Sequence, residues 1–176
     1  YVLELTDEEN AFCQSYKEHV GIKAEELVIG FNTGCSELYP NKKMTIDQHV
    51  ALIDRLHTLE GAKLVLAGGS EDTQRNSEIV RRVGSKVIST PTTEGLRRGL
   101  CYENICDVII SGDSFGMHAA IALKKFVLVW FGVSCWTEID LYERGEKFIP
   151  LGLHCWPCWK RSCPFILEWI QMINLD

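Results

Sequence analysis

Short apolar runs alternate along this chain with longer stretches in which apolar residues recur every three or four positions. Four runs have the length and composition of buried strands: 27–32 (LVIGFN), 63–67 (KLVLA), 107–111 (DVIIS) and 126–131 (FVLVWF). A shorter strand is predicted at 86–89. Strands separated by helices of about 10 to 15 residues are typical of right-handed βαβ units. The pattern therefore predicts an α/β fold with a Rossmann-like, doubly wound parallel sheet, in which 126–131 is the last strand.

The stretches between these strands have the apolar spacing of amphipathic helices. Two capping boxes mark helix starts, Thr6 with Glu9 and Thr45 with Gln48. The second of these helices keeps one apolar face as far as Leu59. The predicted helices lie at 6–19, at 45–60, around 79–83, around 96–105, at 114–123 and at 165–173.

The length of 176 residues corresponds to about one domain. Apolar residues make up 46% and charged residues 24%, which excludes a disordered chain. We assign residues 1–150 to the Rossmann-like domain, with a leading helix within 1–21. Residues 151–176 are predicted to form a cysteine- and tryptophan-rich loop followed by a C-terminal helix.

The formal net charge is −6, which makes a broad electrostatic contact with nucleic acid unfavourable. Nucleic acid is therefore not an expected partner, and any phosphate would be bound by a local pocket. The apolar runs are far shorter than the roughly 20 residues of a membrane span, so no transmembrane segment is predicted. The first residues lack the basic segment and the cleavage site of a signal peptide.

The eight cysteines fall into two groups. Five are scattered through apolar or turn segments and are interpreted mostly as small core residues in a reducing compartment: Cys13, Cys35, Cys101, Cys106 and Cys135. The other three, Cys155, Cys158 and Cys163, have half of the spacing of a structural zinc or iron–sulfur site, without a clear fourth ligand. The alternatives are a disulfide formed after purification and free thiols packed beside Trp156 and Trp159.

Polar and glycine-rich segments follow three of the predicted strands. They are Thr33–Ser36 with Lys42 and Lys43, Gly68–Asp72, and Gly112–His118. Ligands of doubly wound sheets bind outside the carboxyl ends of the strands, where helix N-termini accept anions. Neither the GxGxxG fingerprint nor the GxxxxGK[ST] P-loop occurs, so a different phosphate-binding arrangement is required.

The third of these segments has the strongest features of a phosphate site. Ser114 and the N–H groups near Gly116 are predicted to hold a pyrophosphate at the start of a helix. His118 lies one turn further, where it would donate to a phosphate oxygen; the alternative is a core histidine.

The first two segments are open to two interpretations each. Lys42 or Lys43 could supply a point charge to a β-phosphate, or both could be solvated surface residues. Glu71 and Asp72 could accept hydrogen bonds from ribose hydroxyls, or they could be first-turn acids that the helix dipole stabilises.

These three segments resemble sequence motifs of glycosyltransferase family 9. The run ISGDSFGMHAAIALKKFVLVWFG (110–132) is similar to the family signature, in which a strand ends in D-S-G-P-M-H and a later strand ends in F-G. The loop FNTGCSELYPNKKMT (31–45) and the segment LVLAGGSED (64–72) resemble its lysine loop and its Gly-Gly segment. The resemblance covers residues 27–135. The family contains ADP-heptose:lipopolysaccharide heptosyltransferases, GT-B enzymes whose C-terminal domain binds the nucleotide sugar.

The resemblance implies a donor site built from the same positions. Thr33, with Gly34 beside it, and Lys42 would lie at the donor phosphates, and Glu71 or Asp72 near the ribose. Four further residues would form the donor cradle: Asp113, Ser114, Gly116 and His118.

The chain departs from the family pattern at three positions. Phe115 stands where the family usually has glycine, and Gly116 stands in place of proline, which implies a shift of the phosphate cradle by one residue. Met44 replaces a common tryptophan, so the choice between Lys42 and Lys43 stays open.

The function implied by the resemblance is donor binding in an inverting GT-B glycosyltransferase of lipopolysaccharide or related glycan synthesis. The donor would be an ADP-heptose-like nucleotide sugar, and the acceptor a glycolipid bound by an N-terminal domain that also carries the carboxylate base. Transfer would require no cofactor, and this segment alone would bind nucleotide weakly without turnover. The implied location is the cytoplasm, peripheral to the inner membrane. The alternatives are a non-catalytic nucleotide-binding module and another GT-B-like enzyme such as a sugar epimerase.

Overall fold

The computed structural model describes residues 2–149 and 154–162. Within these ranges the core is a six-stranded, all-parallel sheet in the order β3-β2-β1-β4-β5-β6. The prediction of a doubly wound parallel sheet is confirmed. The strands are β1 (Leu27–Asn32), β2 (Ala62–Ala67), β3 (Ile88–Ser89), β4 (Val108–Gly112), β5 (Phe126–Trp130) and β6 (Gly145–Phe148).

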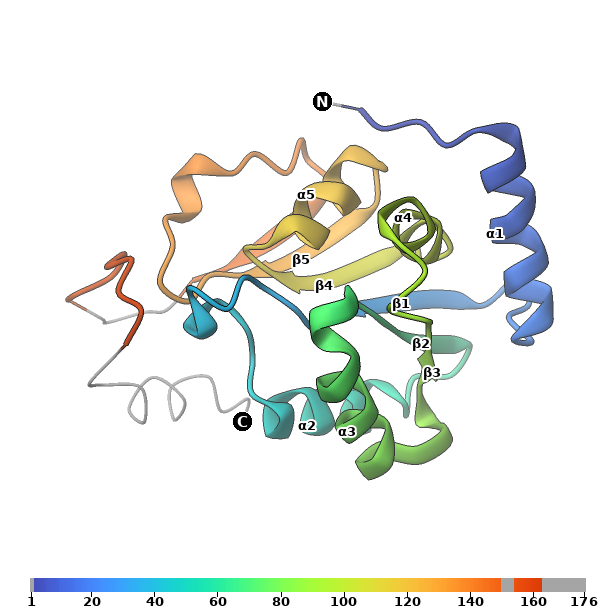
Figure 1. Ribbon diagram of the computed structural model, residues 1–176, viewed down its shortest axis with the longest axis horizontal. Coiled ribbons are helices and arrows are strands. Elements are labelled where there is room, and N and C mark those ends of the chain that lie inside the picture. Colours follow the sequence, from blue (N-terminus) through green and yellow to red (C-terminus); the bar gives the residue numbers. More distant parts are fainter. Residues whose placement is uncertain (1, 150–153, 163–176) are drawn as a thin grey trace.

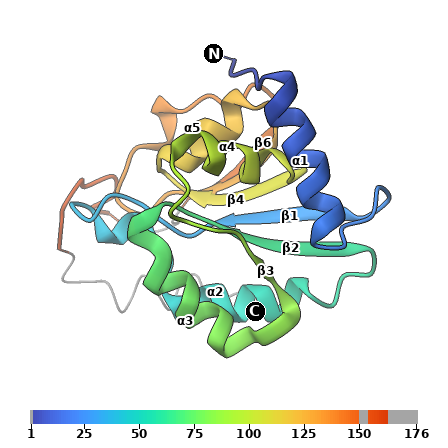
Figure 2. The same cartoon turned by 45° about the vertical axis from the view of Figure 1, so that its right-hand side comes forward.

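Helices cover both faces of the sheet (Figures 1 and 2). One face carries α1 (Asp7–His19), α4 (Leu96–Asn104) and α5 (Phe115–Ala122), and the other carries α2 (Ile46–Leu56) and α3 (Thr73–Val83). The strand order reverses between β1 and β4, which are neighbours at the centre of the sheet. A reversal of this kind opens a crevice at the carboxyl ends of the two strands.

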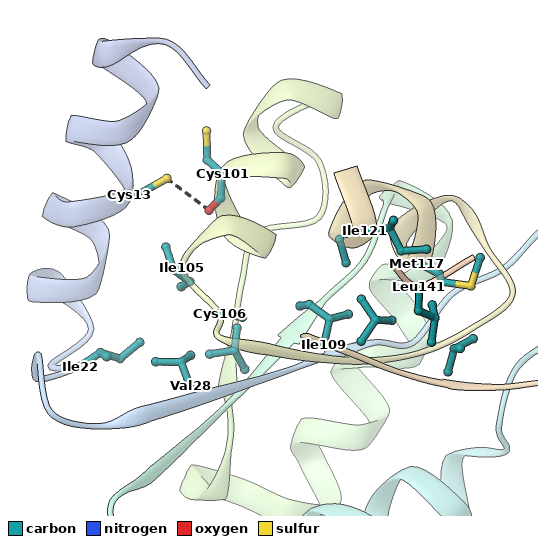
Figure 3. Close-up of a cluster of buried hydrophobic side chains, with 14 of the residues drawn as sticks. Cys13, Ile22, Val28, Cys101, Ile105, Cys106, Ile109, Met117, Ile121 and Leu141 are labelled. Atoms are coloured by element: carbon teal, nitrogen blue, oxygen red, sulfur yellow. Dashed lines mark hydrogen bonds between the residues drawn. The ribbon is translucent and has the colours of Figure 1, made fainter. Parts of the chain in front are cut away.

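Each face of the sheet has its own apolar core. Cys13 of α1 and Cys101 of α4 face each other between these two helices, and Cys106 lies nearer the sheet in the same core (Figure 3). The interpretation as small core residues is confirmed for these three thiols, whereas Cys35 and Cys135 are only partly buried. Burial raises the pKa of the Cys106 thiol far above its usual range. The opposite core contains Phe31 and Ile53, both fully buried, beneath α2 and α3.

Both predicted capping boxes are present, at Thr6 and at Thr45. The second helix is shorter than predicted, because α2 ends at Leu56 and Leu59 lies outside it with nearly half of its surface exposed. The Thr58 hydroxyl donates to the Arg55 carbonyl oxygen over 2.7 Å, which satisfies an acceptor at the helix end. The apolar spacing of Leu59 therefore gave a false helical signal.

The prediction that 126–131 is the last strand is wrong, because β6 pairs with β5 at the sheet edge. The sequence of β6, GEKF, has a single large apolar residue, Phe148, and its side chain is exposed. Gly145 has a φ of +157°, and a Cβ there would lie 2.1 Å from the Val127 carbonyl oxygen. Backbone pairing rather than side-chain burial holds this strand, and apolar periodicity cannot detect it.

Residues 154–162 pack against the loops after β1 and β5. The backbone N–H of Trp159 donates to the Val133 carbonyl oxygen over 3.0 Å, and the Trp159 ring contacts the Tyr39 ring edge-on. The predicted helix at 165–173 lies outside the described residues. No helix in the described ranges has both the length and the apolar character needed to cross a bilayer.

His49 gives a pH dependence to stability. Burial, together with the nearby Arg75 guanidinium, lowers its pKa from 6.5 to about 4. The unfolded state therefore binds more protons than the folded state between these values, so stability falls as the pH is lowered. We expect the free energy of unfolding to drop between about pH 7 and about pH 5 by about 2 kcal/mol more in the native chain than in His49→Gln. Urea unfolding at both pH values measures this difference; equal drops would contradict it.

Candidate functional site

A cavity of about 560 Å³ lies at the carboxyl ends of the central strands. Its walls come from the segments that follow β1 (residues 34–36), β2 (68–72) and β3 (90–93), from the first turn of α5, and from one face of α4. Asn32, the last residue of β1, also lines it. The cavity therefore occupies the crevice where the strand order reverses, and its volume is typical of small-molecule sites.

A buried polar network connects β1 to the start of α5. The Asn32 amide Nδ2 donates to Ser111 Oγ over 2.9 Å and to Ser114 Oγ over 2.7 Å. Ser114 is the N-cap of α5, where its hydroxyl accepts from the Met117 N–H. A Cβ on Gly116 would lie 2.4 Å from Asn32 Cγ. The absence of a side chain at Gly116 thus lets the Asn32 amide reach Ser114.

Asp72 organises the glycine-rich segment after β2. Its Oδ2 accepts from the Gly69 N–H over 3.0 Å, and its side chain is buried. A Cβ on Gly34 would lie 2.2 Å from the same oxygen, so the loop after β1 passes directly against the Asp72 carboxylate. Glu71 is exposed and also lines the cavity. Of the two acids, Asp72 therefore holds the two loops together, and Glu71 is the exposed one in the cavity wall.

The cavity lining includes five of the nine predicted donor-site residues: Gly34, Glu71, Asp72, Ser114 and Gly116. The other four are engaged in contacts around it. Thr33 donates to Asn76 Oδ1 over 2.5 Å. Lys42 Nζ forms an ion pair with Asp113 Oδ2 at 2.7 Å, and His118 Nε2 lies 4.0 Å from Asp113 Oδ1.

The Lys42 ammonium also lies against aromatic rings. It is 4.5 Å from the Trp159 ring centroid and 5.7 Å from the Tyr39 ring centroid. Both members of the Lys42–Asp113 pair are largely buried. The ion pair joins the loop after β1 to the loop before α5 and so fixes the position of the helix N-terminus.

Asn32 and the segment after β3 line the cavity but are not among the residues predicted from the sequence. Residues 90–93 and Gly95 line the cavity, together with Leu96 and Gly99 of α4. Their signal was present, since the polar run TPTTEG directly follows the strand predicted at 86–89 and must lie at the same edge of the sheet. Asn32 was not predicted as a site residue because its position in the sequence is that of the last residue of an apolar strand.

The terminal cysteines are described in part. Cys155 is exposed and Cys158 is half-buried, both as free thiols, and Cys163 lies outside the described residues. Within residues 2–149 and 154–162, no three His, Cys, Asp or Glu side chains form a group that could hold a metal ion. The zinc or iron–sulfur site therefore stays a prediction, which metal analysis under reducing conditions tests.

The sequence profile of glycosyltransferase family 9 (heptosyltransferase) matches residues 2–167. The chain belongs to glycosyltransferase family 9. It is 24% identical over 148 residues to lipooligosaccharide heptosyltransferase 2 of Campylobacter jejuni, a match that covers 81% of this chain and 46% of that protein. The family 9 chain thus spans about half the length of this curated relative.

Solved structures of family 9 proteins share the fold. The family 9 glycosyltransferase of Veillonella parvula superposes with a TM-score of 0.75 at 21% identity, over 99% of this chain and 48% of that one. Heptosyltransferase WaaC of Escherichia coli with ADP gives a TM-score of 0.64 at 18% identity, over 86% and 46% of the two chains.

Proposed function

We propose that this family 9 chain is the C-terminal, donor-binding half of an inverting GT-B heptosyltransferase, and that its donor is ADP-heptose. The observation that carries the proposal is the cavity at the strand-order reversal, with the N-terminus of α5 opening onto it through Ser114 and Gly116. Backbone N–H groups at a helix N-terminus are suited to a diphosphate. The WaaC relative with ADP supports this nucleotide.

The donor diphosphate is placed against the first turn of α5 and the glycine-rich segments after β1 and β2. Ser114 caps the helix by accepting from the Met117 N–H, which leaves the N–H groups of Phe115 and Gly116 for the diphosphate, and Gly34 and Gly69 let the backbone approach closely. These donors stabilise the negative charge that develops on the leaving diphosphate as the glycosidic bond breaks. Glu71, exposed in the cavity wall, accepts from the ribose hydroxyls.

The four predicted residues outside the lining take supporting positions. Thr33 and Lys42 hold the loop after β1, and Asp113 holds Lys42 beside the start of α5. His118 of α5 lies beside Asp113, and we propose that it donates to a phosphate oxygen when the donor binds. We propose that Lys42 supplies positive charge behind the diphosphate.

Transfer also needs a base that deprotonates the acceptor hydroxyl. The chain spans about half of the relatives it matches, and we propose that the base and the glycolipid acceptor site belong to the other half. The C. jejuni relative is named a lipooligosaccharide heptosyltransferase, which supports a glycolipid acceptor at the membrane surface. The 176-residue chain by itself is expected to bind donor without turnover.

Calorimetric titration with ADP, UDP and GDP tests the proposal. We expect ADP to bind most tightly, and Ser114→Ala to weaken it about tenfold, because loss of the cap removes a hydrogen bond next to the diphosphate. Ser77→Ala is the matched control, since the Ser77 hydroxyl donates to the Thr73 carbonyl oxygen within α3 and Ser77 is not among the described residues that line the cavity. Failure of all three nucleotides to bind, or equal affinity in Ser114→Ala, would contradict donor binding at this cavity.

A further inference from the structure

A carboxyl group with one buried oxygen that has no hydrogen-bond partner among the described residues lies in the wall of the cavity. Glu103, on α4, is 7% exposed and belongs to the cavity lining. Its Oε2 has no hydrogen-bond partner among the described residues. A buried, unpaired carboxyl costs stability, and such groups persist where a ligand completes them.

The face of α4 that holds Glu103 is otherwise apolar and open. Leu96, Gly99 and Leu100 lie one turn or two turns before it and also line the cavity. A Cβ on Gly99 would meet no atom within 4 Å, so the cavity extends up to the helix backbone at that position. Pro91 contributes to the lining from the segment after β3. Thr90, Thr92 and Thr93 of the same segment also line the cavity. A wall of apolar side chains with a few polar groups is suited to a flat aromatic ligand.

This wall is distinct from the anion-binding elements. The diphosphate is assigned to the first turn of α5, whereas the Glu103 wall consists of α4 and the segment after β3. A diphosphate alone would leave most of a cavity of about 560 Å³ unfilled. Since the diphosphate is assigned to the first turn of α5, the wall formed by α4 and the segment after β3 is available to the nucleoside.

We infer that Glu103 is a specificity-determining residue that hydrogen-bonds the edge of the donor's nucleobase. This inference rests on the proposed function. A base edge presents a donor next to an acceptor, which a carboxyl group with one O–H and one C=O complements.

The protonation state of Glu103 agrees with this partner. Burial raises the pKa of Glu103 from 4.5 to about 8, so that near neutral pH much of the carboxyl carries its proton. An un-ionised carboxyl both donates and accepts, and it avoids repulsion with a diphosphate bound in the same cavity.

The test compares three ligands in one chain: ADP, ribose 5-phosphate and inorganic pyrophosphate. In Glu103→Leu we expect ADP affinity to fall about tenfold or more, with affinity for ribose 5-phosphate and for pyrophosphate changed less than twofold. The midpoint of thermal unfolding without ligand should stay equal or rise, because an unpaired buried carboxyl is removed. Glu103→Gln, which keeps the shape, should lower ADP affinity less and change the preference among ADP, GDP and UDP.

The matched control is Glu78→Gln, which removes a carboxylate paired with Arg81 on α3, outside the lining. Unchanged ADP affinity in both Glu103 variants would overturn the inference and leave donor binding intact. An equal loss for ribose 5-phosphate would also overturn it, in favour of a ribose contact. Absence of ADP binding by the native chain would reject the proposed function together with this assignment.

Discussion

Gly116→Ala is expected to lower ADP affinity by at least tenfold and to destabilise the fold by about 1–3 kcal/mol. The added Cβ would lie between 2.4 and 2.8 Å from the atoms of the Asn32 amide group. The amide is buried and donates to both Ser111 and Ser114, so it cannot yield without breaking the network that holds the start of α5. Calorimetric titration and urea unfolding measure the two effects.

Gly99→Ala is the matched control for the stability effect, because it makes the same change in another helix. No atom lies within 4 Å of a Cβ at that position. Alanine favours a helix interior over glycine, so we expect Gly99→Ala to raise stability by about 0.5–1 kcal/mol. If both alanines changed stability in the same direction, the close contact between Gly116 and Asn32 would not have the assigned role.

Lys42→Met is expected to destabilise the fold by about 2–3 kcal/mol, because it leaves the Asp113 carboxylate largely buried without its cation. The two side chains are 14% and 12% exposed, and the Lys42 ammonium also loses its contact with the Trp159 ring. Urea unfolding of the single variant gives the loss directly.

A double-mutant cycle isolates the ion pair from the packing of Lys42. The variants are Lys42→Met, Asp113→Leu and the two together, and the double variant should lose at least about 1 kcal/mol less than the sum of the single losses. An additive result would mean that the two charges do not interact in the folded chain. The pair would then not fix the loop after β1 to the start of α5.

The sheet and most helices could be predicted because their side chains are buried in a regular pattern. β1 was predicted at its observed bounds, since both of its faces are covered and most of its residues are apolar and buried. β6 was not, because its place depends on backbone pairing and on Gly145 at the Val127 carbonyl oxygen. An edge strand with exposed side chains has no apolar periodicity to read.

The cavity could be predicted in part, because topology places polar strand ends at one edge of the sheet. Ser114 and Gly116 were found in this way, and the segment after β3 could have been found by the same rule. Glu103 could not be predicted, since a single acidic residue in a predicted helix is usually a solvated surface residue. Its burial follows from the packing of α4 onto the sheet, which spacing in one helix does not reveal.

The most direct test of donor binding is a two-dimensional amide NMR spectrum of the labelled chain during titration with ADP. We expect the largest shifts at Gly34, Gly69, Ser114 and Gly116, whose amides surround the assigned diphosphate position. The exposed side of α3, at Ser77 and Arg81, should stay unchanged. Shifts confined to residues outside the cavity, or no shifts at millimolar ADP, would contradict the assignment of this cavity as the donor site.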